Sequence, residues 1–218
     1  ATGRAGDLED GDKAFARKDF GQALNLYRKA AASGDAVAQF RLGTMYSKGQ
    51  GTPQNFRDAA AWFLQSATKG YALAQNSLGV RYEKGQGVPQ NIMQAATLYR
   101  EAAEQRLGLA QDNLSDLYAK GLGVEKDPVL AHVWSSLASA NGEAGAAKKR
   151  VALERAMSKT QLAEAHTHLG MMYARGRGVA QDARKSAQWL QKAADAGFMI
   201  AQFELAGYYD KGTGVTKN

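Results

Sequence analysis

The sequence lacks cysteine and has little proline and few β-branched aliphatic residues, and each shortage excludes a class of protein. Without cysteine the chain has no disulfide, no thiolate nucleophile and no cysteine-bound metal. Only 3 of 218 residues are proline and 44% are hydrophobic, which argues against a disordered or low-complexity chain. Because 2 Ile and 9 Val stand against 41 Ala, an all-β fold is excluded and a helical fold is indicated.

Long apolar runs are also missing. No stretch approaches the roughly 20 apolar residues that cross a bilayer, so no transmembrane segment is expected. The chain begins with Ala1-Thr2-Gly3-Arg4, which resembles the start of a protein after signal-peptide cleavage. We therefore expect a periplasmic or secreted protein, and a cytoplasmic location is the alternative.

The chain is basic but has no basic domain. It contains 28 Lys and Arg against 21 Asp and Glu, a net charge of +7. The densest basic cluster lies within residues 148–159 and consists of Lys148, Lys149, Arg150, Arg155 and Lys159. No aromatic or groove-reading features accompany the cluster, so a solvated helix face is favoured and no nucleic-acid partner is expected. Binding of an acidic polymer through this cluster is a further alternative.

A motif of the type Leu-Gly-x-x-Tyr recurs along the chain. The copies begin at Leu42, Leu78, Leu114, Leu169 and Leu205. An alanine precedes each leucine by four residues, so Ala, Leu and Tyr share one helical face. Each of these helices is expected to end at a basic residue followed by glycine, which permits the left-handed closing conformation. The expected N-caps of the helices that follow are Asn55, Asn91, Asp127 and Asp182.

A second helix in each unit carries a large residue at matching places, namely Trp62, Leu98, Trp134 and Trp189. Residues 8–34 fit the same frame as a looser, tetratricopeptide-like unit. The combined pattern resembles the Sel1-like repeat family over nearly all of residues 36–218. The resemblance implies an all-α fold, a right-handed α/α superhelix (solenoid) of about twelve helices. It also implies an adaptor that binds other proteins, often outside the bacterial cytoplasm.

One step between repeats is longer than the others. Leu169 follows Leu114 by 55 residues instead of 36, which predicts an extra helix within 144–157. The expected parts are a tetratricopeptide-like unit with Sel1-like repeats at 1–142, an inserted helix and linker at 143–164, and C-terminal repeats at 165–218. A local insertion is expected to leave the flanking repeats intact, because each repeat contacts only its neighbours.

The chain stops at Asn218, the position of a helix N-cap. The last repeat is therefore expected to lack its second helix. Its absence should leave Ala201, Leu205 and Tyr209 uncovered. We expect a monomer, or weak self-association through this repeat.

Few residues suit catalysis or metal binding. Of the three histidines, His132 stands alone in the sequence, and His166 and His168 point away from each other on a helix. No metal site and no cofactor are expected. Ser66 and Lys69 form a Ser-x-x-Lys motif, as in penicillin-recognising enzymes, but no Lys-Thr-Gly partner accompanies them. A β-lactam or cell-wall enzyme is thus the alternative to a protein that is not an enzyme.

The remaining faces of the first helices are available for binding. If Ala38, Leu42 and Tyr46 face the core, positions 40, 41 and 44 point elsewhere, and their residue types vary between copies. We call this set the first-helix stripe: Phe40, Arg41, Thr44, Asn76, Ser77, Val80, Asp112, Asn113, Asp116, Thr167, His168, Met171, Phe203 and Glu204. Phe40 is the strongest candidate for an anchor, because an exposed aromatic residue favours binding. The prediction is a non-enzymatic adaptor that binds a protein or peptide on the concave solenoid surface.

Overall fold

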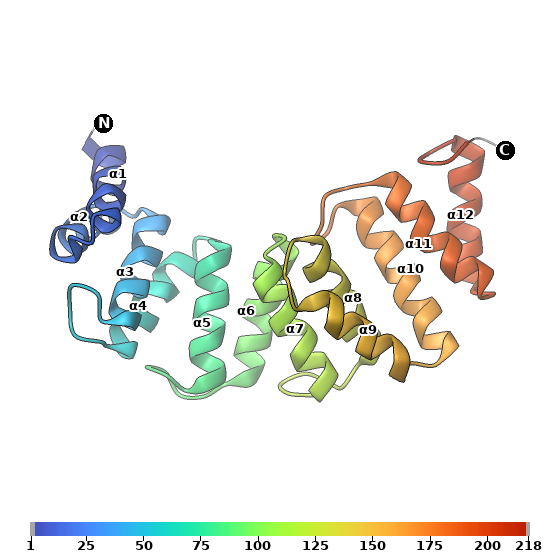
Figure 1. Ribbon diagram of the computed structural model, residues 1–218, viewed down its shortest axis with the longest axis horizontal. Coiled ribbons are helices and arrows are strands. Elements are labelled where there is room, and N and C mark those ends of the chain that lie inside the picture. The colour runs from blue at the N-terminus through green and yellow to red at the C-terminus, as the bar shows by residue number, and fades with distance from the viewer. Residues whose placement is uncertain (1–2, 217–218) are drawn as a thin grey trace. The chain divides into compact units, whose positions relative to one another are not determined.

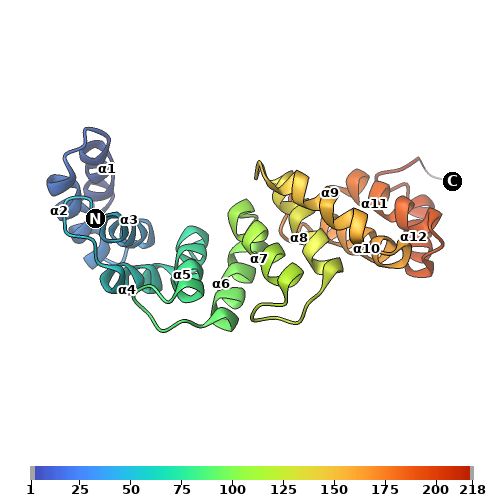
Figure 2. The ribbon, with the colours of Figure 1, turned by 60° about the horizontal axis from the view of Figure 1, so that its bottom comes forward.

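The computed structural model describes residues 3–216, which form twelve α-helices and no β-strand, as the sequence predicts (Figure 1, Figure 2). The helices are α1 Gly3–Ala16, α2 Phe20–Ala32, α3 Ala36–Lys48, α4 Phe56–Ala67, α5 Ala72–Lys84, α6 Ile92–Glu104, α7 Gly108–Lys120, α8 Pro128–Ala140, α9 Ala146–Ala156, α10 Lys159–Arg175, α11 Ala183–Asp195 and α12 Met199–Lys211. The expectations attached to Ala1, Thr2 and Asn218 lie outside the described residues.

The predicted helix ends are confirmed. The closing glycines adopt left-handed φ angles between 64° and 68°, at Gly49, Gly85, Gly121, Gly176 and Gly212. Asn55 Oδ1 accepts hydrogen bonds from the backbone N–H groups of Arg57 and Asp58, at 3.0 and 3.1 Å. Such caps satisfy amides that the helix itself leaves without partners.

The glycine of the repeated motif allows the two helices of a unit to approach closely. A Cβ atom at Gly43 would lie 2.5 Å from the ring of Phe63, and one at Gly79 would lie 2.7 Å from the ring of Tyr99. In the third copy Ser115 replaces the glycine, and the residue equivalent to Phe63 is also small, Ser135. Size at these two positions is therefore matched within each unit.

A glutamine that sequence analysis overlooked joins consecutive units. It follows the motif alanine in four repeats, as Gln39, Gln75, Gln111 and Gln202. The first three are at most 5% exposed, and Gln202 is exposed. Gln111 Nε2 donates to the carbonyl oxygens of Ala103 (2.9 Å) and Gly178 (2.6 Å). The recurrence of the Ala-Gln pair in the sequence could have revealed this glutamine.

The chain divides into two compact units, residues 1–102 and 103–218. The first contains buried clusters around Tyr27 and Leu42 and around Phe63 and Leu78. The expected division at 142/143 and 164/165 falls inside the second unit and stays a prediction.

The inserted helix is α9, as predicted, and it packs against α8 (Figure 1). Ala146 is its one buried residue. Ser158 starts α10 with a capping box to Gln161. Since α9 buries little apolar surface, polar contacts largely hold it in place.

The expectation that Ala201, Leu205 and Tyr209 are uncovered is wrong. Ala201 is 0% and Leu205 is 6% exposed, because both pack with α11, and Tyr209 is partly buried. The large apolar residues exposed on α12 are instead Met199, Ile200 and Phe203, at 80%, 54% and 81%.

Candidate binding surface

In the first unit, the stripe begins with residues of α3. Phe40 is partly buried, with its ring centroid 5.8 Å from that of Phe63 and 5.3 Å from that of Tyr71. The predicted anchor thus contributes to the core, and only part of it can reach a partner. Arg41 is exposed and its Nε lies 3.4 Å from Asp12 Oδ1, a pair that water screens strongly.

The other stripe residues of this unit lie on α3 and α5. Thr44 Oγ1 donates to the carbonyl of Phe40 at 3.0 Å, within the same helix. Asn76, Ser77 and Val80 are partly buried on α5. Arg41 is therefore the most accessible of the predicted binding residues in this unit.

In the second unit, the acidic part of the stripe meets the inserted helix. Lys149 Nζ of α9 lies 2.7 Å from Oδ1 of Asp112 and 2.7 Å from Oδ1 of Asp116 on α7. Burial alone would lower the pKa of Lys149, but the two carboxylates outweigh it and raise that pKa. The basic cluster and the acidic stripe, predicted as rival sites, thus partly neutralise each other. Asn113, between the two aspartates, is partly buried.

Thr167 does not lie on the surface, contrary to the prediction. It is 3% exposed and its Oγ1 donates to the carbonyl of Ala163 at 2.9 Å. The reason is that α10 packs against α8 as well as α11. His168 is exposed beside Glu164 at 4.0 Å, and Met171 is partly buried. Phe203 and Glu204 are exposed on α12.

The Ser-x-x-Lys motif does not form a nucleophile and base pair. Ser66 is fully buried and its Oγ donates to the carbonyl of Ala36 at 2.6 Å. Lys69 Nζ donates to the carbonyl of Gly34 and to Gln39 Oε1, at 2.5 and 3.0 Å. Both side chains join neighbouring helices, and neither activates the other.

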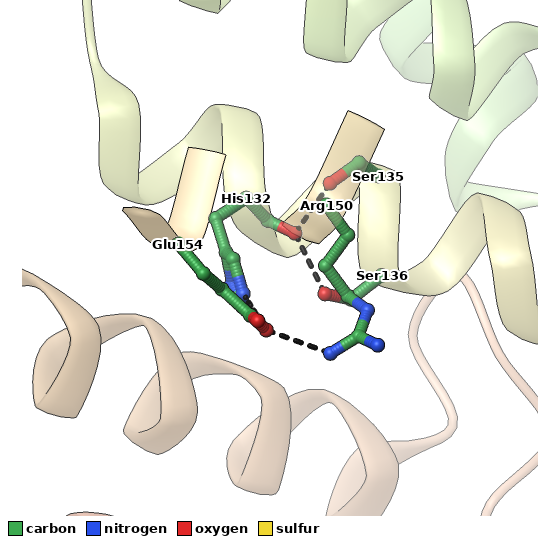
Figure 3. A network of polar contacts seen from close by, with 5 residues as sticks. All are labelled: His132, Ser135, Ser136, Arg150 and Glu154. Atoms are coloured by element: carbon green, nitrogen blue, oxygen red, sulfur yellow. Dashed lines mark hydrogen bonds and ion pairs between the residues drawn. The ribbon is translucent and has the colours of Figure 1, made fainter. Parts of the chain in front are cut away.

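A buried polar network surrounds His132, which the sequence analysis treated as isolated (Figure 3). His132 Nε2 lies 3.0 Å from Glu154 Oε1, and Arg150 Nη1 donates to the same oxygen at 2.7 Å. The hydroxyl groups of Ser135 and Ser136 donate to the main-chain carbonyl of His132, not to its ring. The network therefore lacks a serine poised for activation by the imidazole.

The fold also brings His166 to this network. The ring centroids of His132 and His166 are 6.0 Å apart, and Trp189 lies 5.1 Å from His166. Burial, together with His132 and Lys192, lowers the pKa of His166 to about 4. Burial also lowers the pKa of His132, although Glu154 opposes this. The contact joins α8 and α10 across the insertion, so sequence spacing could not reveal it.

Residues 3–216 contain neither a metal site nor a helix that could span a membrane. In this part of the chain no group of three or more histidine, aspartate or glutamate residues is placed to hold a metal ion. None of its helices has the length and apolar character that spanning a membrane requires.

Comparisons with known proteins agree with this helical repeat fold. A family model described as Sel1 repeat matches residues 4–35, 36–71, 72–107, 108–143, 163–198 and 200–218. The chain therefore belongs to the Sel1 repeat family, with the helical solenoid fold that the sequence predicted. The family model also covers residues 4–35, which include the looser, tetratricopeptide-like unit expected at residues 8–34.

Two solved structures resemble the chain over 97% of its length. One, with 35% identity and a TM-score of 0.61, is a protective antigen of uropathogenic Escherichia coli strains that displays an SLR fold. The other, with 29% identity and a TM-score of 0.60, is a Sel1 repeat protein from Oxalobacter formigenes. The chain spans 42% of the first protein and 79% of the second. No curated protein matches the chain. Sel1 repeat proteins are in general protein-interaction scaffolds and are typically not enzymes.

Proposed function

We propose that this protein is a non-enzymatic scaffold that binds a protein or peptide partner through its first-helix stripe. The observation that carries the proposal is the contrast between two sets of positions. The packing residues repeat from copy to copy, as Ala38 and Leu42 do at Ala74 and Leu78, and all four are at most 2% exposed. The stripe residues vary between copies, and Phe40 and Phe203 are the one pair of equivalent stripe positions with the same residue. Repeat proteins that bind partners hold packing constant and vary the binding face in this way.

The proposed contact in the first unit centres on Arg41 and Ser77. Arg41 has the charge and exposure to pair with a partner, and Ser77 lies at the equivalent position of the next repeat. Phe40 supplies the exposed part of its ring beside them. The surroundings of Ser66 and Lys69 give no support to the enzyme alternative. Periplasmic or secreted location stays a prediction of the sequence.

The experiment begins with crosslinking in the native host, identification of the captured protein, and purification of that partner. Titration calorimetry then compares the full chain with the double variant Arg41→Glu/Ser77→Arg. We expect at least a tenfold loss of affinity, because the variant reverses one charge and adds bulk at its neighbour.

The matched control is Arg57→Glu, which reverses an exposed charge on α4 outside the stripe. It should bind like the original chain. Equal affinity of the stripe variant and the original chain would overturn the proposal. Hydrolysis of nitrocefin that is lost in Ser66→Ala would instead establish the enzyme.

A further inference from the structure

The two compact units each contain a groove built from equivalent repeat positions. In the first unit a cavity of about 390 Å³ lies between α4, α5 and α6, and its lining includes Tyr82, Gln94, Leu98 and Glu101. In the second unit a cavity of about 490 Å³ is lined by Tyr173, Lys185, Gln188, Trp189, Gln191 and Lys192. We call the second cavity the α11 groove.

The correspondence follows from the helix caps. Asn91 and Asp182 occupy the same position, each accepting from the backbone N–H three residues later. Counting from these caps, Lys185, Trp189 and Lys192 stand where the first unit has Gln94, Leu98 and Glu101. The groove is thus a feature of the repeat, and its charge is what differs between the units.

The α11 groove combines positive charge with aromatic surface. Lys192 Nζ lies 4.2 Å from the ring centroid of Trp189, and Lys185 Nζ lies 5.6 Å from that of Tyr173. Every charged residue in the described lining is a lysine. An adjoining cavity of about 570 Å³ shares Gln188 and adds Arg184. Lys185 Nζ also lies 3.8 Å from Asp182 Oδ2, a pair that water screens. The positive charge of the lining favours an anionic ligand.

The spacing of the two lysines suits an extended peptide. Seven residues along a helix are about two turns, or roughly 10.5 Å, so Lys185 and Lys192 lie on one face with Trp189 between them. A peptide in the extended polyproline II conformation has three residues per turn and rises about 3.1 Å per residue, so its residues i and i+3 lie on the same side, roughly 9 Å apart. Two carboxylates at that spacing can therefore reach both ammonium groups while the chain between them passes over the indole.

The uncharged lining favours a polypeptide over a nucleic acid. The Gln191 amide already donates to Asp195 Oδ1 (2.7 Å) and accepts from the Tyr209 hydroxyl (3.2 Å). The amide of Gln188 is therefore the one that offers both a donor and an acceptor to a ligand. A peptide group has one donor and one acceptor to match it, whereas a phosphodiester offers only acceptors. We propose that the α11 groove binds an extended acidic segment of a protein partner, with Asp or Glu at i and i+3. This proposal rests on the proposed function, that the chain binds protein.

The probe is a fluorescein-labelled, capped peptide with the sequence Gly-Ser-Glu-Leu-Ala-Glu-Gly-Ser. Fluorescence anisotropy at low salt compares it with a peptide that carries Gln in place of both Glu and with one that has the two Glu adjacent. We expect the first peptide to bind at least tenfold more tightly than either comparison peptide. Absence of binding, or equal binding of all three, would overturn the proposal.

The protein variants copy the first unit. Lys185→Gln/Lys192→Glu introduces the residues found at the equivalent positions of the first unit. Trp189→Leu does the same for Leu98. Both variants are therefore compatible with the repeat. We expect at least a tenfold loss for the charge variant and a smaller loss for Trp189→Leu. The matched control, Lys148→Gln/Lys159→Glu, makes the same charge change at exposed lysines outside the groove and should bind normally.

An equal loss of affinity in that control would show that binding depends only on the net charge of the protein, which would overturn the proposal. Tighter binding of an oligothymidylate of equal charge would also overturn it. Circular dichroism verifies that each variant is folded. Because the peptide is a defined probe, its failure removes the α11 groove alone. The proposed function is decided separately, by the stripe variant and the captured partner.

Discussion

His132 Nε2 lies 3.0 Å from Glu154 Oε1 although the histidine has no exposed surface. With its pKa lowered by burial, the imidazole is neutral and its Nε2–H donates to the carboxylate. Burial works against ionised Glu154, but His132 and Arg150 outweigh it and hold the pKa of that carboxyl below its usual value. The pair links α9 to α8, and Nδ1 remains a buried acceptor with no hydrogen-bond partner. A proton added here is therefore destabilising.

We predict that the free energy of unfolding decreases as the pH falls. The folded-state pKa of His166 is about 4, whereas an unfolded histidine titrates near 6.5. The unfolded chain thus binds more protons than the folded chain between about pH 6.5 and 4, and stability is lost across that window. Arg150 and Lys192 face the histidines and act in the same direction, and Glu154 opposes them. Urea unfolding should show a loss of about 1–2 kcal/mol between pH 7.5 and 5.

The control for this prediction is His166→Gln, since glutamine stands at that repeat position as Gln39, Gln75 and Gln111. The variant should lose much less stability between the two pH values. The same pH dependence in the variant would show that His166 does not carry the effect.

The helices were predictable because their signals are local and repeated. Caps such as Asn55 and closing glycines such as Gly49 lie within a few residues of the helix ends that they define. The insertion was visible as a longer step between motifs. Which face of α12 is exposed could not be predicted, because the burial of Leu205 depends on how α11 packs across it.

A second prediction concerns Arg106, where the repeat has glycine in other units. Arg106 has φ = 71°, in the region occupied by Gly34, Gly70, Gly142 and Gly197. A residue with a Cβ atom is strained in this conformation, by roughly 1–2 kcal/mol. Glycine removes the strain but increases the entropy of the unfolded chain. Arg106→Gly should therefore raise the free energy of unfolding by about 0.5–1 kcal/mol, as measured by urea unfolding.

The reverse substitution supplies the control. Gly70 has φ = 80°, and a Cβ atom there would meet no atom within 4 Å. Gly70→Arg should destabilise the chain by a similar amount, through backbone strain alone. Stabilisation by Gly70→Arg, or destabilisation by Arg106→Gly, would contradict the argument.

The binding residues were less predictable than the helices. Helical periodicity correctly directed Arg41 to the surface, but it could not reveal that Phe40 packs on Phe63 and Tyr71. It also missed that α9 carries Lys149 to Asp112. These contacts join residues far apart in the chain, and no local pattern encodes them.

The last prediction tests how α9 is held. Lys149→Met keeps much of the side-chain length but removes the charge between Asp112 and Asp116, which then repel each other across a partly buried site. The expected cost is about 1–2 kcal/mol, between the values for exposed and buried ion pairs. Since Ala146 is the one buried residue of α9, the loss should appear as faster amide hydrogen exchange in residues 146–156. Lys148→Met, at an exposed neighbour, should change neither quantity.

Adding Asp112→Asn/Asp116→Asn to Lys149→Met should restore most of the stability, because neutral amides do not repel. Unchanged exchange in Lys149→Met would mean that the Glu154–His132 pair alone holds the helix in place.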